Sequence, residues 1–70
     1  QKSLFVGHYK TPSESKKDER SLRNRGIASF LFCINGEYTL NITTGNEVVL
    51  ERMAVGLRNL GYDAFISEKI

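Results

Sequence analysis

Cysteine, histidine and long apolar runs are scarce in this sequence of 70 residues, and each scarcity excludes a class of function. The one cysteine, Cys33, excludes an internal disulfide, and its place in the apolar run 30–34 predicts a buried, unreactive thiol. His8 is the only histidine, and no His, Cys or acidic residues stand at metal-ligand spacing, so we expect no enzyme and no metal or cofactor site. No stretch approaches the ~20 apolar residues of a membrane span.

Charge of one sign is also scarce. Ten Lys and Arg oppose eight Asp and Glu, which gives a formal net charge of +2. This excess is too small and too evenly spread to indicate nucleic-acid binding by counterion release. No basic segment followed by an apolar one opens the chain, so the sequence contains no recognisable signal peptide. A chain of this length buries only about 60% of its unfolded surface, which predicts one small domain with an economical core.

The sequence does contain a near repeat of itself. The stretch 22–31 returns 35 residues later (57 − 22 = 35) as 57–66, with Leu, Arg, Asn, Gly and Phe in register. In each copy a glycine, Gly26 or Gly61, follows a polar helix-like stretch and precedes an apolar run that contains Phe. This pattern is typical of a helix that ends at glycine and leads into a strand. We therefore expect two copies of one helix-to-strand unit.

The first helix has a clear beginning and end. Residues 3–6 are apolar and β-prone, and the following Thr11, Pro12 and Glu14 match a capping box with proline at the first helical position. These signals predict a strand and then a helix that ends at Gly26. Large apolar residues are rare in this helix, so we expect it to contribute little to the core.

A hairpin and a second helix follow. The Asn35-Gly36 pair predicts a tight turn between strands over 28–34 and 37–42. Asn46 and Glu47 open the second helix, which Gly61 ends, and 63–67 supplies the last strand. Five apolar residues of the second helix fall at helical spacing and are expected to pack on the sheet: Val49, Leu50, Met53, Leu57 and Leu60.

The order of elements, βαββαβ, predicts an α+β fold of the ferredoxin-like (RNP-like) type. In this sandwich two helices cover one face of a four-stranded antiparallel sheet, and the other face is open. Phe30 follows Gly26 by four residues, as Phe65 follows Gly61, so the two rings share a face. The residues expected on the helix-covered face are Leu4, Val6, Leu31, Cys33, Tyr38, Leu40, Ile42, Ala64 and Ile66. Those expected on the open face are Phe5, Phe30, Phe32, Thr39, Asn41, Phe65 and Ser67.

Such an open face suits a neutral polymer. Aromatic rings pack on the apolar faces of sugars, while hydroxyl and amide groups pair with sugar hydroxyls, which favours a glycan ligand. The opposite parity, with the Phe residues in the core, stays open because both faces of the strand over 28–34 are apolar.

In its motifs the sequence resembles the SPOR domains, the sporulation-related-repeat modules of bacterial division and cell-wall proteins. The resemblance rests on Val6-Gly7-His8-Tyr9, on the segment 35–42, and on a Leu-x-x-x-Gly-aromatic-x-Ala-aromatic pattern over 57–65. It covers nearly the whole chain, and internal duplication is a family trait. Thr43-Thr44-Gly45 stands where the family usually has Gly-Pro-aromatic, so the chain resembles a divergent member.

This resemblance implies a function. It implies that residues 1–70 are a single domain, the C-terminal module of a longer protein, and that the domain binds peptidoglycan without catalysing a reaction. Glycan strands stripped of stem peptides are the implied ligand, and targeting of a cell-envelope or cell-division protein to the wall is the implied role. The implied location is the periplasm or cell wall. The implied contacts lie on the sheet face, at Phe5, Phe30, Phe32, Thr39, Asn41 and Phe65.

Other functions stay open beside this one. The open face could serve as a protein–protein interface, and regulatory modules of similar topology bind small ligands. RNA-binding domains share the βαββαβ plan and stack bases on sheet aromatics. Their third strand carries aromatic and basic residues, and 39–42 has neither.

Overall fold

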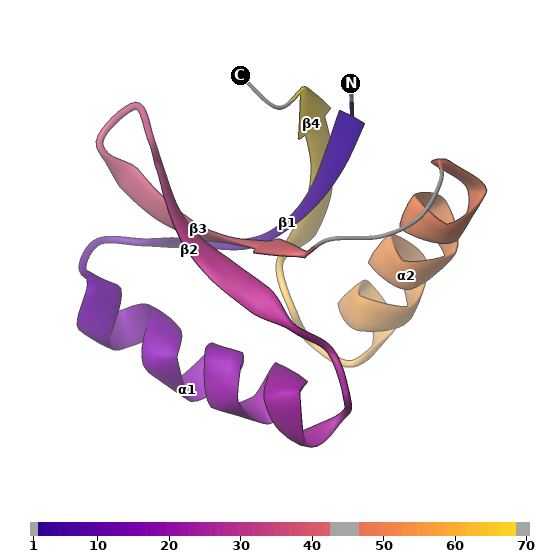
Figure 1. Cartoon of the computed structure of the whole chain (residues 1–70), viewed down its shortest axis with the longest axis horizontal. Helices are drawn as coiled ribbons and strands as arrows, with labels where there is room; N and C mark the ends of the chain where they lie inside the picture. The colour runs from indigo at the N-terminus through magenta and orange to yellow at the C-terminus, as the bar shows by residue number, and fades with distance from the viewer. Residues whose placement is uncertain (1, 43–46, 69–70) are drawn as a thin grey trace.

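The predicted βαββαβ fold is confirmed. The computed structural model describes residues 2–42 and 47–68, so Thr43-Thr44-Gly45 and Asn46 lie outside the described residues. The sheet has the order β2-β3-β1-β4, and all its neighbouring strands are antiparallel (Figure 1). The elements are β1 (Lys2–Tyr9), α1 (Pro12–Asn24), β2 (Ser29–Ile34), β3 (Glu37–Ile42), α2 (Glu47–Asn59) and β4 (Ala64–Glu68).

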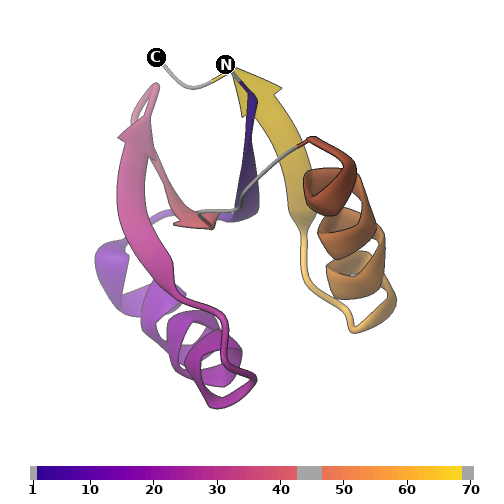
Figure 2. The same ribbon diagram turned by 45° about the vertical axis from the view of Figure 1, so that its right-hand side comes forward.

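The sheet is strongly curved. Figures 1 and 2 show the β2–β3 hairpin rising on one side and the far ends of β1 and β4 rising on the other. Both helices lie on the outer side of this curve, so the face without helices is concave. Right-handed strand twist, accumulated over four strands, produces such curvature.

The core lies between the convex face and the two helices. Alternation along β1 sends Leu4 and Val6 into it, and alternation along β3 sends Leu40 and Ile42, as predicted. Tyr38, also expected there, is half-buried and is not a member of the core cluster. Phe5 is fully buried but is not a member of this cluster. The buried members are Leu4, Val6, Leu22, Leu40, Ile42, Leu50, Ala54, Leu57 and Ala64.

The prediction that the convex side of β2 is buried is wrong. Leu31 and Cys33 alternate onto the convex face, opposite Leu40 and Tyr38 of β3, yet Leu31 is 42% exposed and Cys33 is exposed. The reason is the place of β2 at the edge of the sheet, where the helices leave the outer strand partly uncovered. Cys33 is therefore an accessible thiol.

Both copies of the repeat end in the same helix cap. Gly26 and Gly61 adopt φ values of +82° and +99°, the left-handed region that glycine enters at low cost. The residue after each glycine donates its amide to the carbonyl of the leucine that begins the repeat, as in a Schellman motif. These bonds join Ile27 N to Leu22 O and Tyr62 N to Leu57 O, each at 2.9 Å.

Polar contacts fix α1 where apolar residues are few. At its start the Thr11 hydroxyl accepts a hydrogen bond from the amide of Glu14 at 3.4 Å, as the capping box predicts. Farther along, the Tyr9 hydroxyl donates to Asp18 Oδ2 at 2.6 Å, and Ser21 bonds the hydroxyl of Tyr62. The helix is thus tied to β1 and to the segment that precedes β4.

The Tyr9–Asp18 bond predicts a pH effect. Burial of the phenol, together with the hydrogen bond and charge of Asp18, raises the pKa of Tyr9 well above its ordinary value of 10.0. Above pH 10 the native state keeps the phenol proton that the unfolded chain releases. The contribution of Tyr9 to the free energy of unfolding is therefore complete below pH 10 and is lost as the pH rises above it. We expect Tyr9→Phe to cost about 1 kcal/mol at neutral pH. Urea melts from pH 8 upward should also show a shallower alkaline decline for the variant, and equal declines would contradict the assignment.

The second helix packs on the sheet through three of its five predicted residues, Leu50, Met53 and Leu57. Leu50, Ala54 and Leu57 are buried at spacings of four and three residues, and Met53 is half-buried. Val49 is 39% exposed, and Leu60, at 53%, follows the last helical residue. The sequence pattern missed Ala54 because a small side chain adds little to an apolar count. Among the described residues, no helix is long and apolar enough to cross a membrane.

Candidate functional site

The concave face gathers all seven residues predicted for it. Strand register sets Phe30, Asn41, Phe5 and Phe65 in one row across β2, β3, β1 and β4. Directly opposed residues of antiparallel strands share a face, so this row is common to the four strands. Phe32 and Thr39 are opposed on β2 and β3, and Ser67 is opposite Ser3 on β4 and β1.

Burial divides these residues into a floor and a surface. Phe5, Thr39 and Asn41, on the central strands, are 0%, 2% and 3% exposed, so they lie beneath the surface. Phe32 and Phe65 are half-buried, whereas Ser67 is exposed and Phe30 is 60% exposed. A ligand on this face therefore meets the outer strands first, because Phe5, one of the four rings predicted for this face, is fully buried.

The curvature of the sheet accounts for the buried floor. The ring of Phe5 lies 6.1 Å from that of Phe32 and 5.6 Å from that of Phe65, measured between centroids. Rings from the two sides of the sheet thus close over Phe5. Asn41 also has a structural role here, because its Nδ2 donates to the carbonyl of Leu4 at 3.1 Å. Sequence alternation predicts a face but not its curvature, so this layering was not foreseen.

A small hollow opens at the hairpin end of the concave face. Its volume is about 140 Å³, and its lining includes Thr39, whose Oγ1 is buried without a hydrogen-bond partner among the described residues. A buried hydroxyl without a partner costs free energy, so it is a candidate for pairing with a ligand hydroxyl or amide. We call this the Thr39 hollow; it is lined by His8, Ile34, Asn35, Glu37, Thr39, Phe65 and Ser67.

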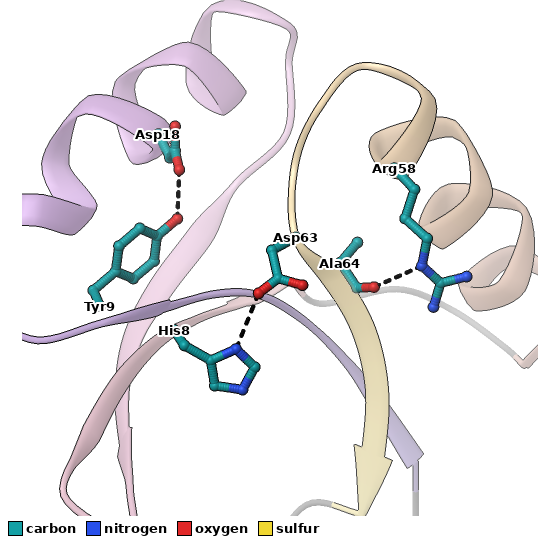
Figure 3. A network of polar contacts seen from close by, with 6 residues as sticks. All are labelled: His8, Tyr9, Asp18, Arg58, Asp63 and Ala64. Carbon is teal, nitrogen blue, oxygen red and sulfur yellow. Dashed lines mark hydrogen bonds and ion pairs between the residues drawn. The ribbon is translucent and has the colours of Figure 1, made fainter.

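His8 also belongs to this face, although the sequence predicted no function for it. Its ring stacks on Phe65 with centroids 4.8 Å apart and planes 8° apart, and its Nδ1 lies 3.0 Å from Asp63 Oδ2. Figure 3 shows His8 and Tyr9 pointing in opposite directions, Tyr9 toward α1 and His8 toward Asp63. The stack with Phe65 places the imidazole at the edge of the concave face.

A β-bulge explains how His8 reaches this face. Strict alternation from Phe5 would send His8 to the helices and Tyr9 to the concave side. The register between β1 and β3 shifts between Val6 and Tyr9, and Gly7 in that interval has φ +76°. The bulge reverses the alternation. A glycine followed by a polar residue near the end of a predicted strand was the available signal.

The concave face carries little charge. The seven residues predicted for it carry no ionised group, and Glu37 and His8 lie at the hairpin end. Arg58, on α2, is directed to the carbonyl of Ala64 at 2.8 Å (Figure 3). In the part of the chain that the structure describes, no group of three or more His, Cys, Asp or Glu could hold a metal ion.

Comparison with solved structures identifies the fold. The solution structure of the peptidoglycan-binding domain of the B. subtilis cell wall lytic enzyme CwlC matches with a TM-score of 0.70. The match covers 97% of this chain and 91% of that chain, at 18% sequence identity. The chain has a SPOR-like fold. The SPOR-like fold extends over both copies of the repeat, as the sequence resemblance implied. No family model and no curated protein matches the sequence.

Proposed function

We propose that this chain binds peptidoglycan, through the glycan strands and on the concave face. The observation that carries the proposal is the likeness to a peptidoglycan-binding domain over 97% of the chain, combined with an aromatic concave face in the same molecule. The likeness supports the class of ligand. The choice of face rests on the chemistry of the residues gathered there.

The concave face offers the contacts that a glycan requires. Phe30, Phe32 and Phe65 present rings to the apolar faces of sugars, each ring adding a modest contact. The hydroxyls of Ser67 and of Thr39, in its hollow, are placed to pair with sugar hydroxyl or acetamido groups. Phe5 and Asn41 lie beneath these contacts. Phe5 packs against the rings of Phe32 and Phe65, and Asn41 fixes β3 to β1 through its hydrogen bond to the carbonyl of Leu4.

Charge favours glycan strands without stem peptides over anionic polymers. No Lys or Arg belongs to the row of Phe30, Asn41, Phe5 and Phe65, so nothing there neutralises a phosphate backbone. RNA-binding sheets of this topology combine stacking rings with such cations. A neutral polymer, whose contacts are rings and hydroxyls, matches the concave face better.

The proposed role is attachment rather than catalysis. We propose that residues 1–70 form one binding module, C-terminal in a longer bacterial protein, and that the module holds that protein at the wall in the periplasm or cell wall. Any hydrolytic or division activity would then belong to other parts of the same protein.

Co-sedimentation with purified wall sacculi tests the proposal. We expect the domain to sediment with sacculi, and more of it to sediment after an amidase has removed the stem peptides. Chitin and single-stranded RNA fixed to beads serve as controls for sugar rings and for phosphates. Absence from the sacculus pellet in both treatments, or stronger retention on RNA, would contradict the proposed ligand.

Thr39 offers a sharper test of the concave face. Thr39→Val replaces an unpartnered buried hydroxyl by a methyl of similar size, so we expect unchanged or higher stability, by up to about 1 kcal/mol. Sugar binding in the Thr39 hollow should weaken in the same variant, by roughly 3- to 10-fold. Thr39→Ser, which keeps the hydroxyl, is the matched control. Equal glycan affinity of the Val and Ser variants would remove Thr39 from the site.

A further inference from the structure

The outer edge of β2 lacks the devices that usually protect a sheet edge. Charged side chains, proline and bulges commonly prevent edge strands from pairing with other chains. The β2 sequence, Ser-Phe-Leu-Phe-Cys-Ile, has no charge and no proline, and its register with β3 is regular over all its residues. The other edge strand, β4, ends in a glutamate. The two edges of this sheet are therefore not equivalent.

The hairpin turn determines which backbone groups of β2 face outward. Asn35 and Gly36 have φ values of 51° and 82°, as in a two-residue type I′ turn, and the pair that flanks it is Ile34 and Glu37. In such hairpins the flanking pair exchanges hydrogen bonds, and orientation then alternates along the strand. Cys33, Leu31 and Ser29 consequently direct their N–H and C=O groups away from β3.

The β2 strand is complementary to itself about Leu31. Phenylalanine precedes and follows this residue, and a small residue, Ser29 or Cys33, stands two positions away on each side. A two-fold axis through Leu31 would place Phe30 opposite Phe32 of a second copy and Ser29 opposite Cys33. All three residues with outward groups would then pair. Side chains alternate in the same sense in both copies, so rings would meet rings on the concave side.

Charges at the two ends of the strand agree with this pairing. Antiparallel alignment about Leu31 brings the hairpin of one copy beside the corner between α1 and β2 of the other. Glu37 is exposed at the hairpin, and Arg25 is exposed at that corner. Within the described residues neither has an ion-pair partner in its own chain. In a two-fold pair, these opposite charges would therefore lie at the same end of the paired strands.

We propose that two copies of this chain associate through antiparallel pairing of their β2 strands, with the two-fold axis at Leu31. The result is an eight-stranded sheet in which the concave faces of the two copies adjoin. Such an edge pair is smaller than a standard interface of about 1,600 Å², so the dimer is weak and forms at high local concentration. If the proposed glycan binding holds, two adjoining faces on one polymer also gain avidity.

Sedimentation equilibrium tests the association without any ligand, so its outcome is independent of peptidoglycan binding. From about 10 μM to about 1 mM, the mean mass should rise from 7.9 kDa toward that of a dimer. Leu31→Lys places like charges directly opposite each other and should keep the chain monomeric, with at least a tenfold weaker association. Leu60→Lys, at another exposed leucine, is the matched control and should dimerise like the parent. A monomeric parent at about 1 mM, or equal dimerisation of the two lysine variants, would overturn the proposal.

The register has a separate readout. In a mixture of differently labelled copies, an intermolecular Hα–Hα NOE is expected between Phe30 and Phe32, because such opposed pairs are the closely spaced ones. A dimer without this NOE would overturn the axis at Leu31. Arg25→Glu should weaken the dimer, and its combination with Glu37→Arg should restore it. Failure of the double variant to recover would remove the proposed charge pairing.

Discussion

Replacing Leu40 by alanine is expected to lower the free energy of unfolding by about 2–5 kcal/mol. Leu40 lies on central strand β3, is 0% exposed, and belongs to the cluster between the sheet and both helices. Its removal leaves a cavity that neighbours on several elements cannot fill. For a domain of 70 residues this is a large part of the total stability. Urea unfolding followed by circular dichroism measures the effect.

Leu31→Ala is the matched control for that experiment. Leu31 is the register partner of Leu40 on the same convex face, but it is 42% exposed on the edge strand. The same substitution should therefore cost less than about 1 kcal/mol. The two leucines were equivalent in the sequence pattern, so comparable losses at both positions would contradict the exposed edge that the structure assigns to β2.

Phe65→Ala is expected to reduce glycan affinity by roughly tenfold or more, about 1.4 kcal/mol. Phe65 contacts two other rings of this face, since Phe5 stacks on it at 5.6 Å and His8 at 4.8 Å. It also lines the Thr39 hollow, so its loss removes a ring contact and widens the hollow. Isothermal titration with soluble glycan strands gives the affinity, and thermal unfolding gives the accompanying loss of stability.

Tyr38→Ala provides the control for loss of an aromatic ring. Tyr38 alternates onto the opposite face of β3, where its register partner is Cys33. The substitution Tyr38→Ala removes a ring of similar size from the same sheet without altering the concave face. We expect its glycan affinity to stay within about twofold of the parent. A loss equal to that of Phe65→Ala would indicate that affinity follows overall stability rather than contact with the ligand.

Local signals explain why so much of the fold could be predicted. Glycines at the ends of the two helices, the Asn35-Gly36 turn and the capping box each act within a few residues of chain. Every one of these features has the conformation that its residues favour. The repeat added the relation between distant parts, because Phe30 and Phe65 stand at the same distance from their glycines. The βαββαβ plan then predicted an antiparallel sheet with both helices on one face, and the structure has this arrangement.

The differences arise where several elements act together. Alternation assigns Phe5 to the concave face, but only the curvature of four strands decides that neighbouring rings bury it. Exposure of Cys33 depends on the position of β2 at the edge of the sheet. His8 reached the concave face through a bulge at Gly7, which reverses the alternation that a sequence reading assumes. The burial of Phe5 and the exposure of Cys33 are not contained in a local pattern, whereas Gly7 is a local signal for the bulge.

The side-chain hydrogen bonds that hold α1 were also not predicted from the sequence. Because Leu22 is the one buried leucine of α1, the sequence predicts a helix that contributes little to the core. In the structure, however, the hydroxyls of Tyr9 and Tyr62 form hydrogen bonds with side chains of α1. Such pairs join residues that are 9 and 41 positions apart, a separation at which neither partner indicates the other. Small buried residues such as Ala54 were also missed, because they mark close approach of a helix to the sheet rather than a large hydrophobic area.

Amide chemical shifts of the labelled domain, recorded as glycan strands without stem peptides are added, test the central claim most directly. We predict shifts concentrated at the exposed and half-buried residues of the concave face and around the Thr39 hollow, with the outer faces of α1 and α2 unaffected. Single-stranded RNA of matched length is the control and should give no saturable change. Saturable shifts confined to the helices, or no response to glycan at millimolar concentration, would contradict the claim that this face binds peptidoglycan.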